Sequence, residues 1–117
     1  VVRREPCDEN HVLHLKGRSF AEYWQDRPGQ LRSTVKRKGS KGVVSLRVEH
    51  RFDAQDWADY ETIYARSWKP EEGNPEFLRW LAERESEAGR LRMGMASIDG
   101  QAVAAQFWTV ENGTAYI

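Results

Sequence analysis

Alternating apolar and polar residues predict two adjacent β-strands near the end of the chain, at Leu91–Ile98 and at residues 101–110. Asp99-Gly100 separates these strands, and this pair tolerates the positive φ angles of a two-residue hairpin turn. Asn112-Gly113 repeats that chemistry before a short β-prone segment, residues 114–117. The pattern therefore predicts an antiparallel meander whose third strand has just begun when the sequence stops.

Alternation also predicts which side chains share a face of the middle strand. One face is expected to carry Val103, Ala105, Phe107 and Thr109. The other is expected to carry Ala102, Ala104, Gln106, Trp108 and Val110.

Capping residues and helical periodicity predict two helices in the first third of the chain. Ser19 and Glu22 have the spacing of a capping box, which predicts a short helix beginning at Ser19. Arg27-Pro28-Gly29 interrupts this helix, and a second is predicted over residues 28–38. A short apolar run at residues 12–15 could form a strand before them.

A strand and two more helices are predicted before the meander. The strand covers residues 43–50, with one apolar face made by Val44, Leu46 and Val48. Asp53 is a predicted N-cap for a helix with an aromatic stripe at helical spacing, formed by Trp57, Tyr60, Tyr64 and Trp68. Residues 69–73 break that helix, and Asn74-Pro75 begins the next, which is expected to end near Gly89. Its apolar face carries Phe77, Leu78 and Leu81.

Composition favours a folded α+β domain with no dominant charge. The chain has 117 residues, 39% of them hydrophobic, and 18 Lys and Arg balance 18 Asp and Glu. Cys7 is the single cysteine and cannot form an intramolecular disulfide, and three scattered histidines lack zinc-ligand spacing, so no metal is expected. No apolar stretch approaches the length of a membrane span, which favours a soluble, cytoplasmic protein.

Four stretches carry a family resemblance: residues 19–24 (SFAEYW), 31–38 (LRSTVKRK), 67–69 (SWK) and 100–108 (GQAVAAQFW). They resemble the GNAT-like acetyltransferase family of the cellulose-biosynthesis protein CelD. The resemblance implies an α+β, three-layer GNAT-like fold, with helices packed on an antiparallel β-meander. It also implies acyl transfer from acetyl-CoA to an amine or hydroxyl acceptor, which could be a small molecule or be related to a polysaccharide.

In terms of domains, residues 1–18 are expected to end a preceding domain or linker. Residues 19–117 are expected to be the N-terminal part of the GNAT-like domain.

Acyl-CoA binding in this fold needs a phosphate-binding loop and helix N-terminus after the fourth strand, which would fall beyond residue 117. Residues 39–42 (GSKG) lack P-loop spacing. The expectation is therefore an acyltransferase fold truncated before the phosphate loop, which binds CoA poorly and is inactive in isolation.

The resemblance gives two pairs of candidate substrate-binding residues. Trp68 and Lys69 could line the acceptor side of a cleft, although an aromatic residue at helical spacing is usually core and a lysine near a helix C-terminus usually contacts helix carbonyls. Gln106 and Trp108 could orient an acceptor or border acyl-CoA, although a buried hydrogen bond and edge packing are alternatives. Glu71 or Glu72 could be a general base, or simply a solvated carboxylate. No catalytic or CoA-binding residue is assigned.

Two other functional classes remain open. One is a noncatalytic GNAT-like module that forms homo-oligomers through its open sheet edge at residues 114–117. The other is binding to nucleic acid or an anionic polysaccharide through a basic patch, which a net charge of zero makes unlikely for nucleic acid. That patch comprises Arg32, Lys36, Arg37, Lys38 and Lys41.

Overall fold

The computed structural model describes residues 11–117, so the expectations for Cys7 and for most of residues 1–18 lie outside the described residues. The predicted strand at residues 12–15 is wrong, because residues 11–15 have no regular secondary structure. Of the described residues, those from 11 to 38 belong to one compact unit and Gly39–Ile117 form another.

The two predicted N-terminal helices are confirmed as α1 (Phe20–Gln25) and α2 (Gly29–Gly39). The capping box of α1 is complete: Glu22 N–H donates to Ser19 Oγ at 3.3 Å, and Ser19 N–H donates to Glu22 Oε2 at 2.7 Å. Pro28 directly precedes α2, where its missing N–H costs no helical hydrogen bond. Local sequence signals are therefore sufficient for this part of the chain.

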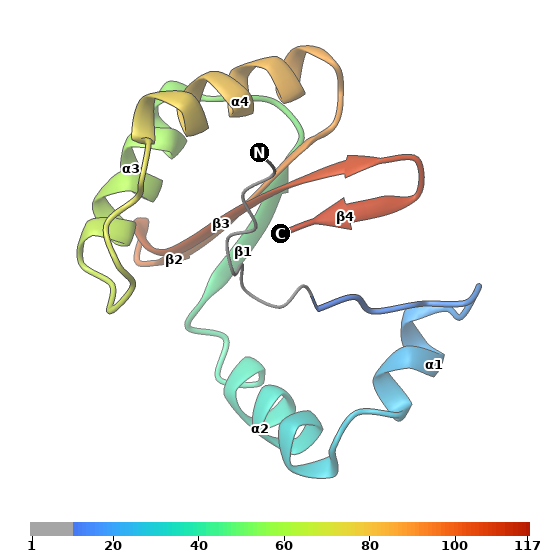
Figure 1. Cartoon of the computed structure of the whole chain (residues 1–117). Helices are drawn as coiled ribbons and strands as arrows, with labels where there is room; N and C mark the ends of the chain where they lie inside the picture. Colours follow the sequence, from blue (N-terminus) through green and yellow to red (C-terminus); the bar gives the residue numbers. More distant parts are fainter. Residues whose placement is uncertain (1–10) are drawn as a thin grey trace. The chain divides into compact units, whose positions relative to one another are not determined.

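Within residues 11–117, four antiparallel strands form one sheet in the order β1-β2-β3-β4 (Figure 1). Their bounds are Ser45–Glu49, Leu91–Ile98, Gln101–Glu111 and Thr114–Tyr116. This arrangement confirms the predicted meander and the α+β, GNAT-like fold class. Both hairpin turns have positive φ at both central residues, with 49° and 78° at Asp99 and Gly100 and 48° and 73° at Asn112 and Gly113.

A β-bulge corrects the predicted faces of β3 at its N-terminal end. Ala96 pairs with Ala104, but Ser97 pairs with Ala102, so Val103 is an extra residue on β3. As a result Ala102 packs against the core and Val103 is exposed, the reverse of the predicted alternation. Beyond the bulge, the alternation of β3 is as predicted.

Helices α3 (Ala54–Ala65) and α4 (Pro75–Glu87) pack on the sheet, α3 against β3 and α4 against β2 (Figure 1). Asp53 caps α3 by accepting from the N–H groups of Gln55 and Asp56, and Asn74 caps α4 by accepting from Phe77 N–H. Because α3 ends at Ala65, the prediction that Trp68 continues the helical stripe is wrong.

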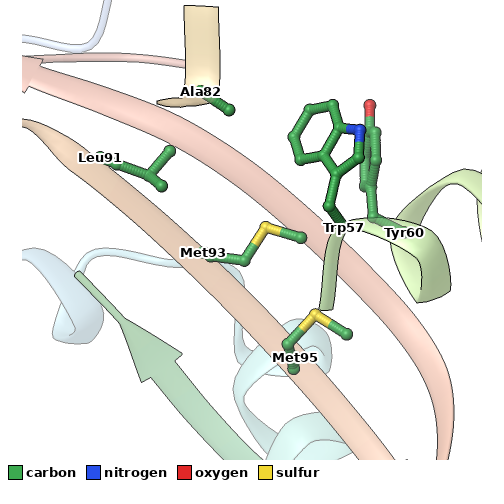
Figure 2. Packing of buried hydrophobic residues seen from close by; sticks show 6 residues of the cluster. All are labelled: Trp57, Tyr60, Ala82, Leu91, Met93 and Met95. Atoms are coloured by element: carbon green, nitrogen blue, oxygen red, sulfur yellow. The ribbon is translucent and has the colours of Figure 1, made fainter. Parts of the chain in front are cut away.

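The core lies between these helices and the sheet. Its buried residues are Trp57, Tyr60, Ala82, Leu91, Met93 and Met95. Figure 2 shows the Trp57 and Tyr60 rings side by side, on the same side of the sheet as the two methionine side chains. Trp57 is 1% exposed, and its ring centroid lies 5.2 Å from that of Phe107 on β3. This aromatic contact holds α3 against the sheet.

An ion pair ties the start of α3 to β1. Arg47 donates to both carboxylate oxygens of Asp56, with one contact at 2.8 Å between Nη1 and Oδ2. The Asp56 side chain is 11% exposed, whereas that of Arg47 is 48% exposed. Paired hydrogen bonds to a mostly buried carboxylate constrain both partners more than a surface ion pair does.

Replacing Asp56 with Asn is therefore expected to lower the free energy of unfolding by about 1.5 kcal/mol, since the charge-assisted bonds to Arg47 are lost. Urea unfolding followed by circular dichroism would measure this. The matched control is Glu83→Gln, which breaks the exposed Arg79–Glu83 pair at 3.1 Å and is expected to cost less than about 0.5 kcal/mol. Equal losses for the two variants would contradict the structural role of the Arg47–Asp56 pair.

Candidate functional site

A cavity of about 340 Å³ lies beside the C-terminal half of α3, where the chain loops over to α4. Its walls include Trp57, Tyr60, Glu61, Tyr64, Glu71, Glu72 and Leu78. Helix α3 contributes the first four of these at positions one turn apart, because residues three and four apart share a helix face. The cavity is thus formed by the aromatic stripe of α3 and by the acidic loop that carries Glu71 and Glu72.

The aromatic rings of the wall are held by one another. The Tyr60 ring centroid lies 4.9 Å from that of Trp57, 6.0 Å from that of Tyr64 and 5.4 Å from that of Phe107. The Phe107 contact is edge-to-face, a favourable arrangement for aromatic pairs. The cavity therefore has a rigid apolar wall connected to the core.

Two carboxylates of the wall are oriented by neutral donors. Trp57 Nε1–H donates to Glu61 Oε1 at 2.9 Å, and Tyr60 OH donates to Glu72 Oε1 at 3.2 Å. Burial raises the pKa of Tyr60, and the negative charge of Glu72 raises it further. The same two causes raise the pKa of Tyr64. The surroundings of both phenols thus oppose any additional negative charge.

Trp68 and Lys69 lie close to the cavity in sequence but are not wall residues. The Trp68 side chain is 90% exposed, so neither a core position nor an enclosed cleft accounts for it. The Lys69 ammonium lies 5.6 Å from the centroid of the Tyr64 ring, a cation–π contact in place of the expected helix carbonyls. Lys69 therefore contacts Tyr64, a residue of the cavity wall, without being a wall residue itself.

Gln106 and Trp108 lie on the opposite face of the sheet from α3. Gln106 pairs with Gly94 and Trp108 with Arg92, whereas Phe107 between them points to the core. The predicted pair is therefore confirmed to share a strand face, but the structure does not bring it together with Trp68 and Lys69. Gln106 is exposed, so the alternative of a buried hydrogen bond does not apply.

A glycine makes room for the Trp108 ring. A Cβ built at Gly94 would lie 3.2 Å from Cζ3 of Trp108 and 3.6 Å from Cη2. The indole therefore lies against the β2 backbone, where any larger residue would displace it. This contact explains why a glycine interrupts an otherwise strand-forming segment.

The acetyltransferase (GNAT) domain family matches residues 25–117. The chain belongs to this family. Neither a curated protein nor a solved structure matches it. Membership gives the chain a general acyltransferase function, and GNAT proteins generally use acetyl-CoA; the likeness to CelD in particular stays a prediction.

The N-termini of the two helices that flank the cavity do not form a CoA phosphate site in this GNAT domain. A pyrophosphate needs unsatisfied N–H groups at a helix N-terminus. At α3 and α4 those groups are capped by Asp53 and Asn74, and Glu76 adds negative charge to the first turn of α4. These two helix ends do not fit a phosphate, so the acyl-CoA phosphates are not placed there.

No group of three or more His, Cys, Asp or Glu within residues 11–117 could hold a metal ion, and this includes the cavity carboxylates. None of the helices described in the same range is long and apolar enough to cross a membrane.

The sequence missed Tyr60, Tyr64 and Glu61 as site residues. Helical periodicity places the two tyrosines on the aromatic stripe of a core-facing helix, which is correct for Tyr60 but does not reveal the cavity beside it. Both candidate bases, Glu71 and Glu72, line the cavity. The signal that could have found the site is the acidic loop directly after an aromatic helix.

Removing the charge of Glu72 is expected to lower the pKa values of Tyr60 and Tyr64, because that charge opposes phenolate formation. Ultraviolet absorbance during an alkaline titration would show Glu72→Gln ionising at lower pH than the parent. Glu71→Gln is the matched control and should leave the curve unchanged. An identical curve for Glu72→Gln would contradict the described contact.

The raised pKa of Tyr60 also has a consequence for stability. The neutral phenol stabilises the fold fully below the pKa of an unfolded tyrosine, about 10. This contribution is lost as pH rises through the higher pKa of the folded state, so alkaline unfolding should begin above about pH 10.

The fit between Gly94 and Trp108 predicts coupled mutational effects. Gly94→Ala alone should destabilise the protein by about 1 kcal/mol, because the new Cβ displaces the indole. With Trp108→Ala already present, Gly94→Ala should instead stabilise by about 0.5 kcal/mol through reduced chain entropy. Thermal unfolding of the four proteins would measure the coupling, and equal effects in both backgrounds would rule out the contact.

Proposed function

We propose that this GNAT domain takes part in acyl transfer from acyl-CoA to an amine or hydroxyl acceptor, with the acceptor bound in the cavity between α3 and α4. The family match over residues 25–117 carries this proposal. The cavity supports it, because it combines an apolar wall with a few oriented polar groups, as small-molecule sites do. The family subclass we propose is the CelD-like one.

Glu72 is the proposed proton acceptor. Transfer joins the acceptor nitrogen or oxygen to the acyl carbon and breaks the thioester C–S bond, and the acceptor proton must leave. Glu72 lines the cavity and receives a hydrogen bond from Tyr60, which fixes the carboxylate relative to the wall. A base held within reach of a bound acceptor is the requirement for this step.

Two of the four predicted site residues fit this proposal. Trp68 and Lys69 follow α3 and would lie near the entrance for the acceptor. Gln106 and Trp108 are on the opposite face of the sheet, so the sheet would separate them from a thioester that reaches the acceptor, and we assign them no part in this transfer.

A noncatalytic interaction module is the second candidate. Strand β4 is an exposed edge of only three residues, and Leu46 and Val48 of β1 are exposed on the sheet face that bears Trp108. An open edge can pair with a second copy of the chain, and the exposed apolar residues of β1 lie at the other edge of the same sheet. In that case the protein would form homo-oligomers without any requirement for acyl-CoA.

The test is calorimetric titration of acetyl-CoA into this 117-residue chain and into a version extended past Ile117, followed by transfer assays with small amines and alcohols. Binding with transfer by either version supports the acyltransferase. Glu72→Gln should lower transfer at least about a hundredfold and leave acetyl-CoA binding unchanged. Glu76→Gln, at an exposed carboxylate in the first turn of α4 that does not line the cavity, is the control. Absence of binding by both versions, with dimers in sedimentation, would favour the interaction module.

A further inference from the structure

Residues 11–38 are strongly basic, although the net charge of the whole chain is zero. They contain seven Lys and Arg against two acidic residues, a net charge of +5, whereas residues 39–117 contain nine Lys and Arg against thirteen acidic residues. Both acidic side chains of residues 11–38 are already engaged, because Glu22 completes the capping box of α1 and Asp26 pairs with Arg18 at 2.9 Å. Such a difference in charge between two parts of one chain favours an anionic partner for the basic part.

The same residues leave their apolar side chains exposed. None of residues 11–38 is buried. Phe20 is 74% exposed, and its ring stacks on that of Trp24, with 5.9 Å between the centroids and 17° between the planes. The exposed large apolar side chains in this range are Val12, Leu13, Leu15, Phe20, Leu31 and Val35. These residues therefore form a surface that is both apolar and positively charged.

A groove of about 800 Å³ brings aromatic rings and cations of this surface together. Phe20 and Trp24 line it from α1, and Arg32 and Lys36 line it from α2. The two residues of each pair are four positions apart, so each pair lies on one face of its helix. The rings and the cations therefore border the same opening.

An anionic lipid bilayer matches both properties of this surface. Its headgroups attract Lys and Arg, and the acyl boundary beneath them accepts aromatic and aliphatic side chains. Leu31 and Val35 form a row on α2 beside the row of Arg32 and Lys36, an arrangement found in helices that lie in the plane of a membrane surface. Single-stranded nucleic acid would use the rings and the cations, but it offers no apolar partner to these two aliphatic side chains.

We propose that residues 11–38 dock peripherally on an anionic lipid bilayer. Arg32 and Lys36 contact the anionic headgroups, and Phe20, Leu31 and Val35 enter the boundary between headgroups and acyl chains. No helix has to cross the bilayer for this contact. The inference is independent of acyl transfer, because none of these five residues lines the cavity beside α3.

The test is cosedimentation of the 117-residue chain with lipid vesicles. Vesicles containing about one third phosphatidylserine should bind the chain at least about tenfold more tightly than vesicles of phosphatidylcholine alone. Binding should weaken in about 0.5 M salt, because salt screens the attraction. Equal binding to both kinds of vesicle would overturn the proposal. So would no binding to either, whether the chain then binds a single-stranded oligonucleotide, a second copy of itself or neither.

Charge substitutions test the two cations of the groove. Arg32→Gln and Lys36→Gln should each weaken binding to the anionic vesicles about fivefold, because each removes one cation from the lipid surface. Arg51→Gln is the matched control, since it removes an exposed charge between β1 and α3 and should leave binding unchanged. Equal losses in all three variants would mean that overall charge alone drives binding, and would contradict a surface at residues 11–38.

Apolar substitutions test insertion. Phe20→Ala should weaken binding about tenfold and Leu31→Ala about threefold, because less apolar area leaves water at the membrane. Leu46→Ala is the matched control, since Leu46 is 79% exposed on β1, outside residues 11–38. Circular dichroism shows whether each variant is folded, and Leu31→Ala stays informative even if Phe20→Ala disrupts α1. Full binding by both variants would rule out insertion of these side chains.

Quenching by lipids with brominated acyl chains locates the contact among the five tryptophans. Trp24 fluorescence should be quenched on binding, because indole rings settle at the membrane–water interface. Trp24→Phe keeps an aromatic ring beside Phe20 and should remove most of the quenching. Quenching that persists in this variant would place the contact at another tryptophan and overturn the assignment to residues 11–38.

Discussion

The contact between Trp57 and the sheet is the constraint on which the rest of the structure depends. This side chain is almost completely buried, and its ring packs against Phe107 and Phe52 as well as Tyr60. Burial of this large aromatic side chain removes more apolar area from water than burial of any other single residue here. Aromatic pairs also favour particular ring geometries. Because Trp57 packs on the sheet in one orientation, it determines the rotation of α3 about its axis. That rotation in turn determines the positions of Tyr60 and Tyr64.

The two ends of α3 have different electrostatic environments. At the N-terminus, Arg47 neutralises Asp56 through two hydrogen bonds, which stabilises the join between helix and sheet. Towards the C-terminus, Glu61 and Glu72 accept hydrogen bonds from the neutral side chains of Trp57 and Tyr60. The carboxylate at the N-terminal end of α3 is therefore paired with a cation of the fold, whereas these two carboxylates have neutral donors.

Strand alternation explains why the predicted site residues separate into two groups. Phe107 must face α3 because it packs on Trp57 and Tyr60, so Gln106 and Trp108 must face away from α3. Trp68 and Lys69 follow α3, on the other side. The family resemblance named all four residues, but it could not show that the sheet lies between them.

The sequence by itself determined the elements whose signals are local. Capping residues placed the starts of α1, α3 and α4, and Asp-Gly and Asn-Gly pairs placed both hairpin turns, because these signals act over two to four residues. The tertiary structure alone decided the bulge at Val103, the end of α3 before Trp68 and the cavity beside Tyr60 and Tyr64. These features depend on packing between segments far apart in the chain, and no local pattern of residue types contains that information.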